Sequence, residues 1–121
     1  MSARLNATTD ALYRVTPLPS PTPLTITLRV YLVSDRNTSS ILCEVVNSNG
    51  TAYQELRLGA DGTQLLLVTN AGTTSGSQLS VGQWYHLAFV RNGTSFSAYI
   101  NGILDISATY TVSLTPAGLL L

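Results

Sequence analysis

The stretch that most constrains the fold runs from Gly82 to Gly102 and reads GQWYHLAFVRNGTSFSAYING. Two runs of alternating side chains, 84–91 and 94–101, flank the dipeptide Asn92-Gly93. This dipeptide accepts the positive φ angles that a tight β-hairpin turn requires. The first run is largely apolar on both faces, which is typical of a strand inside a sheet. The stretch therefore predicts a β-hairpin whose first strand is central.

Short strands and tight turns recur through the rest of the chain. Residues 24–34 alternate strictly, with an apolar face made of Leu24, Ile26, Leu28, Val30 and Leu32. Further strands are predicted at 3–6, 11–15, 41–47, 52–58, 63–70, 103–109 and within 110–121, with tight turns at 48–51 and 59–62 and a loop at 71–80. No segment has a helical period of useful length. This pattern favours an all-β fold, an antiparallel β-sandwich of the jelly-roll kind.

The length of 121 residues corresponds to one domain, and we predict a single unit over residues 1–121. Four of the five prolines lie in residues 17–23. Proline has no N–H group to donate to a sheet, so this segment cannot be a central strand. We expect it to cross between the two sheets in an extended conformation.

The hairpin also carries a family resemblance. Trp84, His86 and Ala88 alternate on its first strand, and Tyr99 and Asn101-Gly102 follow on its second. In this pattern the chain resembles the LamG-like members of the concanavalin A-like lectin/glucanase superfamily. We expect Trp84 to fill the space between the sheets near the sandwich rim, with His86 and Ala88 on the same side. The Asn-Gly pair should make the tight turn into the next strand.

The chain departs from that family at two places. The family usually has an aromatic residue near Arg29, and its domains usually continue for several tens of residues with a closing strand. This chain stops at an apolar run, Leu119 to Leu121. An apolar strand on an open sheet edge is prone to pair with another chain. We therefore expect protein partners, as a homo-oligomer or a larger assembly, at this edge.

The carboxylates do not form a recognisable catalytic motif. Glu44 and Glu55 lie on separate strands, whereas retaining glycosidases hold two carboxyl groups ~5 Å apart. The two could face each other across a hairpin, but we expect an outward, solvated pair. His86 is the single histidine, and Cys43 is the single cysteine, in an apolar strand where an inert buried thiol is expected. These residues predict that the protein is not an enzyme.

No cofactor is expected from the sequence. The family resemblance implies calcium as a minor alternative, because some relatives bind it through loop aspartates. Asp35, Asp61 and Asp105 are isolated here, whereas calcium needs several oxygen ligands close together. Asp61 is more simply read as a turn residue. We nominate no metal ligand, no catalytic residue and no individual ligand-binding residue.

Charge and composition exclude other functions. Charged residues make up 10% of the chain, and six arginines without any lysine balance six acidic residues at a net charge of +0. No basic stripe exists that could neutralise phosphates, which argues against nucleic-acid binding. No apolar run is long enough to insert into a membrane. No export signal is apparent, which indicates synthesis in the cytoplasm.

Two functions remain open. The first is a non-catalytic surface-structural or adhesive module, most concretely a virion capsid-decoration or other virion structural protein. The alternative is a carbohydrate- or protein-binding LamG-like module excised from a larger extracellular protein. Both place the protein on a virion or an extracellular surface. We expect the functional surface in the loops 35–40 and 71–80, or at the C-terminal edge.

Overall fold

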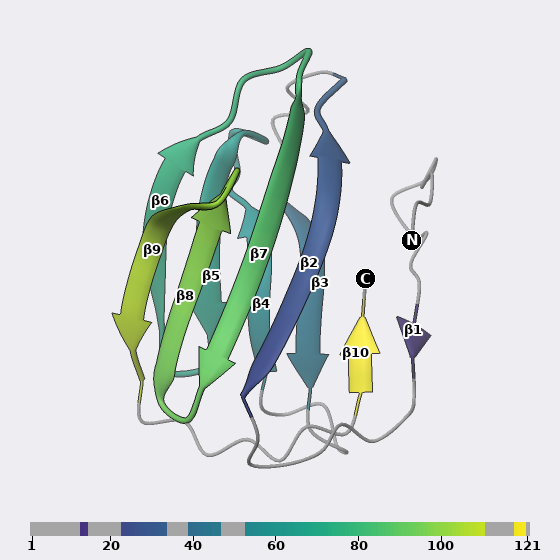
Figure 1. Ribbon diagram of the computed structural model, residues 1–121. Helices are drawn as coiled ribbons and strands as arrows, with labels where there is room; N and C mark the ends of the chain where they lie inside the picture. Colours follow the sequence, from purple (N-terminus) through teal and green to yellow (C-terminus); the bar gives the residue numbers. More distant parts are fainter. Residues whose placement is uncertain (1–12, 15–22, 34–38, 47–52, 111–117, 121) are drawn as a thin grey trace.

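The computed structural model describes residues 13–14, 23–33, 39–46, 53–110 and 118–120, and these form two antiparallel sheets packed face to face (Figure 1). Within these residues, no helix is long and apolar enough to cross a membrane. The strands are β1 (Tyr13–Arg14), β2 (Leu24–Tyr31), β3 (Ser40–Val46), β4 (Tyr53–Leu58), β5 (Gln64–Thr69), β6 (Gly72–Gln78), β7 (Trp84–Asn92), β8 (Ser95–Ile100), β9 (Ile103–Thr109) and β10 (Gly118–Leu120).

The two sheets differ in size, and an edge strand of each lies on the same side of the sandwich. The six-stranded sheet has the order β1-β10-β3-β4-β5-β6, and the four-stranded sheet has the order β2-β7-β8-β9. In Figure 1 the four-stranded sheet lies in front, and β6 and β9 meet along the same side of the sandwich. The predicted fold class, the β3-β4-β5 meander and the central position of β7 are confirmed.

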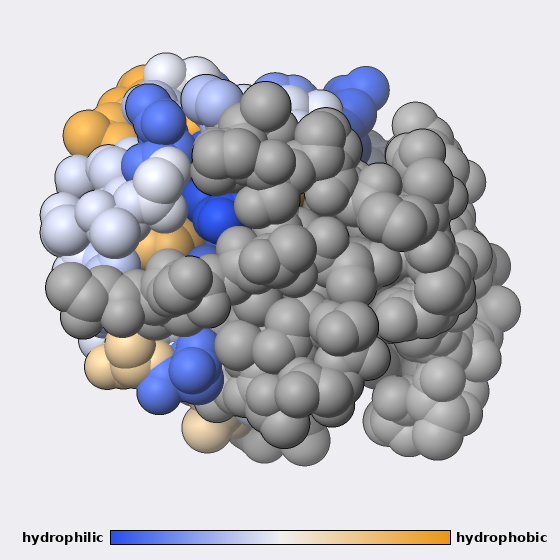
Figure 2. Space-filling view, turned by 90° about the horizontal axis from the view of Figure 1, so that it is seen from below, coloured by the Kyte–Doolittle hydropathy of each residue, from blue (hydrophilic) through white to orange (hydrophobic). Residues whose placement is uncertain are grey.

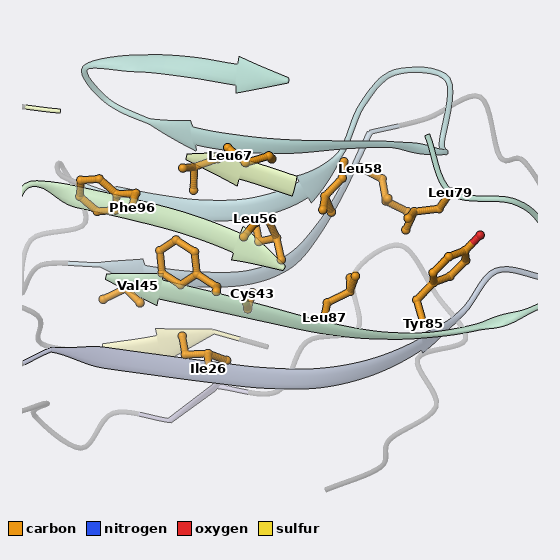
Figure 3. Packing of buried hydrophobic residues seen from close by; sticks show 14 of the residues in the cluster. Ile26, Cys43, Val45, Leu56, Leu58, Leu67, Leu79, Tyr85, Leu87 and Phe96 are labelled. Atoms are coloured by element: carbon orange, nitrogen blue, oxygen red, sulfur yellow. The ribbon is translucent and has the colours of Figure 1, made fainter. Parts of the chain in front are cut away.

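The core fills the space between the sheets with alternate side chains of both. In β2 the predicted apolar face points inward, and Ile26 is 7% exposed. Tyr85 and Leu79 occupy one end of this core and Phe96 the other (Figure 3). The buried cluster consists of Ile26, Leu32, Cys43, Val45, Leu56, Leu58, Leu65, Leu67, Leu79, Tyr85, Leu87, Phe89, Phe96, Ala98 and Ile106.

The predicted turn at 59–62 is confirmed between β4 and β5. Gly62 has a φ of 76°, and its N–H donates to the Gly59 carbonyl at 2.9 Å. The Asp61 carboxylate accepts hydrogen bonds from the backbone N–H groups of Gln64 and Thr63, both at 2.9 Å. These bonds hold the pKa of Asp61 below its ordinary value. Asp61 is therefore a turn residue, as expected from its sequence.

Residues 71–80 contain a strand, so the loop predicted there is wrong. Strand β6 pairs with β5 along the edge of the six-stranded sheet. Every second position from Gly72 to Gly76 is half-buried, as in a strand with one inward face. Because two of these positions are glycines, the sequence shows no alternation of apolar side chains. A Cβ atom on Gly76 would lie 2.1 Å from Asp105 Oδ2 and 2.7 Å from Ile106. Glycine is thus required where β6 approaches β9.

The open C-terminal edge predicted from Leu119 to Leu121 is also wrong. Strand β10 is paired on both sides, with β3 along 118–120 and with β1 at Leu119 and Leu120. The sheet edges belong instead to β1 and β6. The predicted turn at 48–51, the strand at 3–6 and residues 17–22 of the predicted crossover lie outside the described residues. On either side of the first of these segments, Val46 and Tyr53 pair in antiparallel register.

Candidate ligand-binding face

An exposed aromatic pair lies on the outer face of the four-stranded sheet. Trp84 of β7 and Tyr31 of β2 are direct cross-strand neighbours. Their side chains are 57% and 43% exposed, and their ring centroids lie 5.3 Å apart at an interplanar angle of 55°. Two exposed rings lose the stabilisation that burial of their apolar surface would give. Such a pair is therefore a candidate surface for contact with a ligand. We call Arg29, Tyr31, Trp84 and His86 the aromatic face.

A positive charge lies directly on this pair. The guanidinium carbon of Arg29 stands 5.4 Å from the centroid of the Trp84 ring, within the range of a cation–π contact. Arg29 and the exposed His86 are opposite each other across β2 and β7. The aromatic face therefore combines apolar ring surface with hydrogen-bond donors.

The predicted place of Trp84 between the sheets is wrong. The burial of β7 alternates so that Tyr85, Leu87 and Phe89 point inward, and Trp84, His86 and Ala88 share the opposite face. The three residues do lie on one side, as expected, but that side is the outer one. Because both faces of β7 are largely apolar, the alternation alone could not show which face is buried. The buried Tyr85 and Phe89 are the residues that fill the core.

The other residues of the family pattern lie next to this face. Tyr99 of β8 pairs with Ala88, and the turn Asn101-Gly102 leads into β9. Asn101 and Gly102 have φ angles of 51° and 81°, so the predicted tight turn is confirmed. The Asn101 N–H donates to the His86 carbonyl at 2.7 Å, and the His86 N–H donates to Asn101 Oδ1 at 2.9 Å. Asn101 thereby fastens the β8–β9 turn to β7.

A cleft of ≈ 290 Å³ opens behind this turn, between β6 and β9. Ser77, Gln78 and Leu79 contribute to its lining, so the region predicted at 71–80 does border a hollow. Asp105 closes part of it, because its Oδ2 accepts a hydrogen bond from the Ser77 N–H at 2.9 Å and its Oδ1 accepts one from the Ser77 hydroxyl. Of the other predicted loop, 35–40, only Ser39 and Ser40 are described. Seen from below, the side of the molecule that carries β6 and β9 is mixed, with hydrophobic, pale and hydrophilic residues next to one another (Figure 2).

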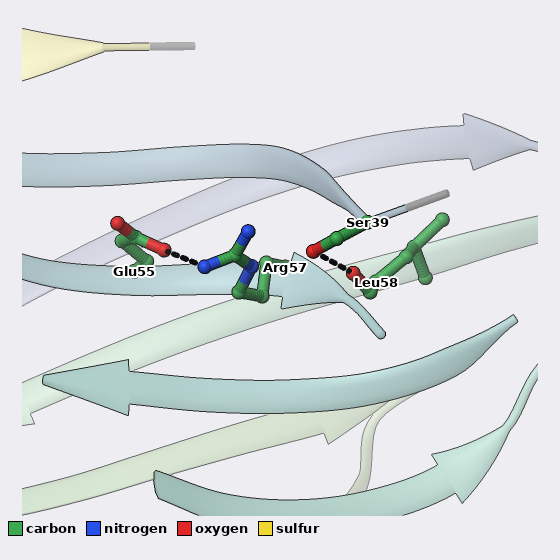
Figure 4. Close-up of polar contacts among 4 residues, drawn as sticks. All are labelled: Ser39, Glu55, Arg57 and Leu58. Carbon is green, nitrogen blue, oxygen red and sulfur yellow. Dashed lines mark hydrogen bonds and ion pairs between the residues drawn. The ribbon is translucent and has the colours of Figure 1, made fainter. Parts of the chain in front are cut away.

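Glu44 and Glu55 face each other across β3 and β4, but they are not the solvated pair expected. Glu55 is 6% exposed, and its Oε2 lies 3.2 Å from Arg57 Nη1 (Figure 4). Burial raises the pKa of both carboxyl groups, and the neighbouring Glu55 charge raises that of Glu44 further. The solvated prediction failed because the outer face of this sheet is itself partly buried at β4.

The raised pKa values predict how stability depends on pH. Both glutamates bind protons more tightly in the folded chain, so their contribution to stability falls as pH rises from about 4.5 through the raised values. Glu44→Gln should reduce this decline and raise the free energy of unfolding near neutral pH by ~0.2–1 kcal/mol, because it removes a cross-strand like-charge pair. Urea unfolding at several pH values measures both effects. An unchanged pH dependence would contradict the assignment.

Other reactive groups are accounted for structurally. Cys43 is 1% exposed, and burial raises the pKa of its thiol to about 12, as the expected inert cysteine requires. Among the residues that the structure describes, no three His, Cys, Asp or Glu side chains lie close enough to hold a metal ion together. Asp61 and Asp105 instead bind groups of the chain itself. Asp35 lies outside the described residues.

Two antiparallel sheets around one core, with the Trp84 strand at the centre of the smaller sheet, define a lectin-like β-sandwich. The chain belongs to the concanavalin A-like lectin/glucanases superfamily, whose family model matches residues 6–120. The resemblance inferred from the hairpin is thus confirmed. No curated protein sequence matches the chain significantly.

Solved structures share the fold at low sequence identity. Domains LG4-5 of the mouse laminin alpha1 chain are 18% identical, with a TM-score of 0.66 over 95% of this chain and 32% of that one. The carbohydrate binding module CBM66 from Bacillus subtilis is 14% identical, with a TM-score of 0.55 over 84% of this chain and 70% of the module. Domain 4 of AbnA, an extracellular arabinanase from Geobacillus stearothermophilus solved with arabinotriose, is 22% identical, with a TM-score of 0.58 over 80% and 50%. This chain therefore spans about a third of the laminin structure.

Proposed function

We propose that the protein is a non-catalytic, saccharide-binding module of surface-structural or adhesive type that acts on an extracellular surface. The observation that carries this proposal is the aromatic face, where Trp84 and Tyr31 are exposed together. The C–H face of a pyranose ring is apolar, so it packs well on an exposed indole or phenol ring. The donors of Arg29 and His86 beside the rings suit sugar hydroxyl groups.

The similar structures support a saccharide as the ligand. Two of them are a carbohydrate binding module and a domain solved with arabinotriose. The arabinanase that contains the second of these domains is extracellular, which favours a role outside cells. The virion-decoration form of this function, and assembly into a homo-oligomer, are finer predictions from the sequence alone. Light scattering at micromolar concentration tests the oligomer, and a monodisperse monomer would contradict it.

Saccharide binding should depend on the Trp84 side chain, whereas the stability of the fold should not. We expect Trp84→Ala to weaken binding of the best-bound polysaccharide at least about tenfold, since aromatic anchors dominate the binding energy of such sites. Affinity gel electrophoresis against a panel of soluble polysaccharides identifies that ligand, and calorimetry measures the loss. The matched control is Ile103→Ala, because Ile103 is 73% exposed and lies outside the aromatic face. Equal binding by Trp84→Ala and the parent would refute the proposal.

A carbohydrate-cleaving enzyme is the alternative that the fold leaves open, because similar structures include a sialidase and an alginate lyase. Glu55 is nearly buried and ion-paired with Arg57, so a sugar cannot reach it without displacing that pair. We therefore expect no release of reducing sugar from polysaccharides that the protein binds. Turnover that disappears in Glu55→Gln would establish an active site here and overturn the non-catalytic assignment.

A further inference from the structure

We propose that the aromatic face selects acidic saccharides, and that Arg29 is the residue that engages the carboxylate of the bound sugar. This inference rests on the proposed function, because it names the class of ligand that the same face binds. It follows from the charge of the face and not from the similar structures.

Arg29 has a charge that the described chain leaves uncompensated. Its guanidinium contacts the Trp84 ring at 5.4 Å, and within the described residues it forms no ion pair. Arg57 differs, because its Nη1 lies 3.2 Å from the Glu55 carboxylate. A guanidinium presents parallel N–H groups whose spacing matches the two oxygens of a carboxylate. An anionic ligand would supply the partner that Arg29 lacks.

Among the described residues of β2 and β7, no carboxylate lies on the outward face around Arg29. Besides Arg29 and the two rings, the exposed, outward positions of β2 and β7 carry Thr25, Thr27, His86 and Asn92, and none of these described positions is acidic. Asp105 belongs to β9 of the same sheet, but its carboxylate accepts both of its hydrogen bonds from Ser77 of β6. Arg29 is therefore the one formally charged side chain at the described outward positions of these two strands, which favours acidic ligands.

The geometry favours a uronate. In a uronic acid the carboxylate is attached directly to the pyranose ring, so a ring packed on Trp84 and Tyr31 presents its charge within a few ångströms. The guanidinium carbon of Arg29 lies 5.4 Å from the centroid of the Trp84 ring, so it is close enough to reach the carboxylate of a sugar packed on that ring. Because the guanidinium rests on the indole, it loses less freedom on binding than a free side chain would.

The test compares two ligands that differ only in charge. One is an oligogalacturonate, and the other is the same oligosaccharide with each carboxylate reduced to a neutral hydroxymethyl group. Calorimetry should show at least about tenfold tighter binding of the acidic form, because a charge-assisted hydrogen bond is stronger than a neutral one. Raising the salt concentration from ~0.05 to ~0.5 M should weaken the acidic ligand only. A sulfated oligosaccharide without carboxylates serves as the third arm and should bind more weakly than the uronate.

Variants assign the effect to Arg29. Arg29→Gln should lose the preference for the acidic ligand while binding the neutral one unchanged, and Arg29→Lys should restore only part of it. Thr25→Ala, an exposed change on the same strand, is the control, and thermal unfolding confirms that each variant is folded. Equal affinity for both ligands, or a preference that survives in Arg29→Gln, overturns this inference and leaves the proposed function standing. Failure to bind any saccharide refutes both.

Discussion

Phe96→Ala should lower the free energy of unfolding by about 3–5 kcal/mol, whereas Trp84→Ala should lower it by less than about 1 kcal/mol. Phe96 is fully buried, and its ring lies 6.5 Å from that of Phe89 and 5.9 Å from that of Tyr110. Truncating it removes apolar burial and leaves a cavity between the two sheets. Trp84 is 57% exposed and contacts Tyr31 and Arg29 on the outer face of the sheet, so its removal leaves no internal cavity.

Urea unfolding followed by circular dichroism measures both values. The signal must not depend on tryptophan fluorescence, because Trp84 is the single tryptophan. Ile103→Ala is the matched control for losing an exposed apolar side chain and should cost as little as Trp84→Ala. A loss of several kcal/mol for Trp84→Ala would place that side chain in the core and contradict the outer face described here.

Gly76→Ala should destabilise the protein by about 2–3 kcal/mol, an unusually large cost for adding one methyl group. The new Cβ would meet the Asp105 carboxylate at 2.1 Å and Ile106 at 2.7 Å. Asp105 would have to turn away and release the hydrogen bond from the Ser77 N–H. This bond joins the edge strands β6 and β9 of the two sheets. The substitution therefore disrupts a contact that holds the sheets together.

The same unfolding experiment tests Gly76→Ala, with Ser75→Ala on the same strand as the control. Ser75 is exposed, so its change should have little effect. In an Asp105→Ala background, Gly76→Ala should cost less than it does alone, because one of its two clashes is gone. Fully additive costs would show that the contact with Asp105 does not limit the position.

The sequence predicts the architecture well because most strands carry a signal in their side chains. In β2 the apolar positions alternate strictly, so the inner face could be assigned before the structure was known. In β6 the inward positions include Gly72 and Gly76, where the lack of a Cβ atom leaves room for the side chains of neighbouring segments. A hydrophobic pattern detects apolar side chains, and glycine has no side chain to contribute. A loop was therefore predicted at these residues.

The candidate site was harder to predict. Both faces of β7 are apolar, and a tryptophan is ordinarily assumed to be the buried residue. Only the partner strands decide the matter: β2 brings Tyr31 and Arg29 to the side of Trp84, and the opposite sheet meets Tyr85 and Phe89. The long-range pairing of β10 between β1 and β3 likewise has no local signal, so the terminal leucines were wrongly expected at an open edge.

The fluorescence of Trp84 tests the central claim most directly, because the single tryptophan reports on the aromatic face without labelling. In the folded protein we expect emission typical of a solvent-exposed indole, readily quenched by acrylamide. Adding the bound saccharide should shift this emission to shorter wavelength and protect it from quenching, with the same midpoint as calorimetry. Emission that is already shielded in the free protein, or that stays unchanged while calorimetry records saccharide binding, would contradict a ligand site at Trp84.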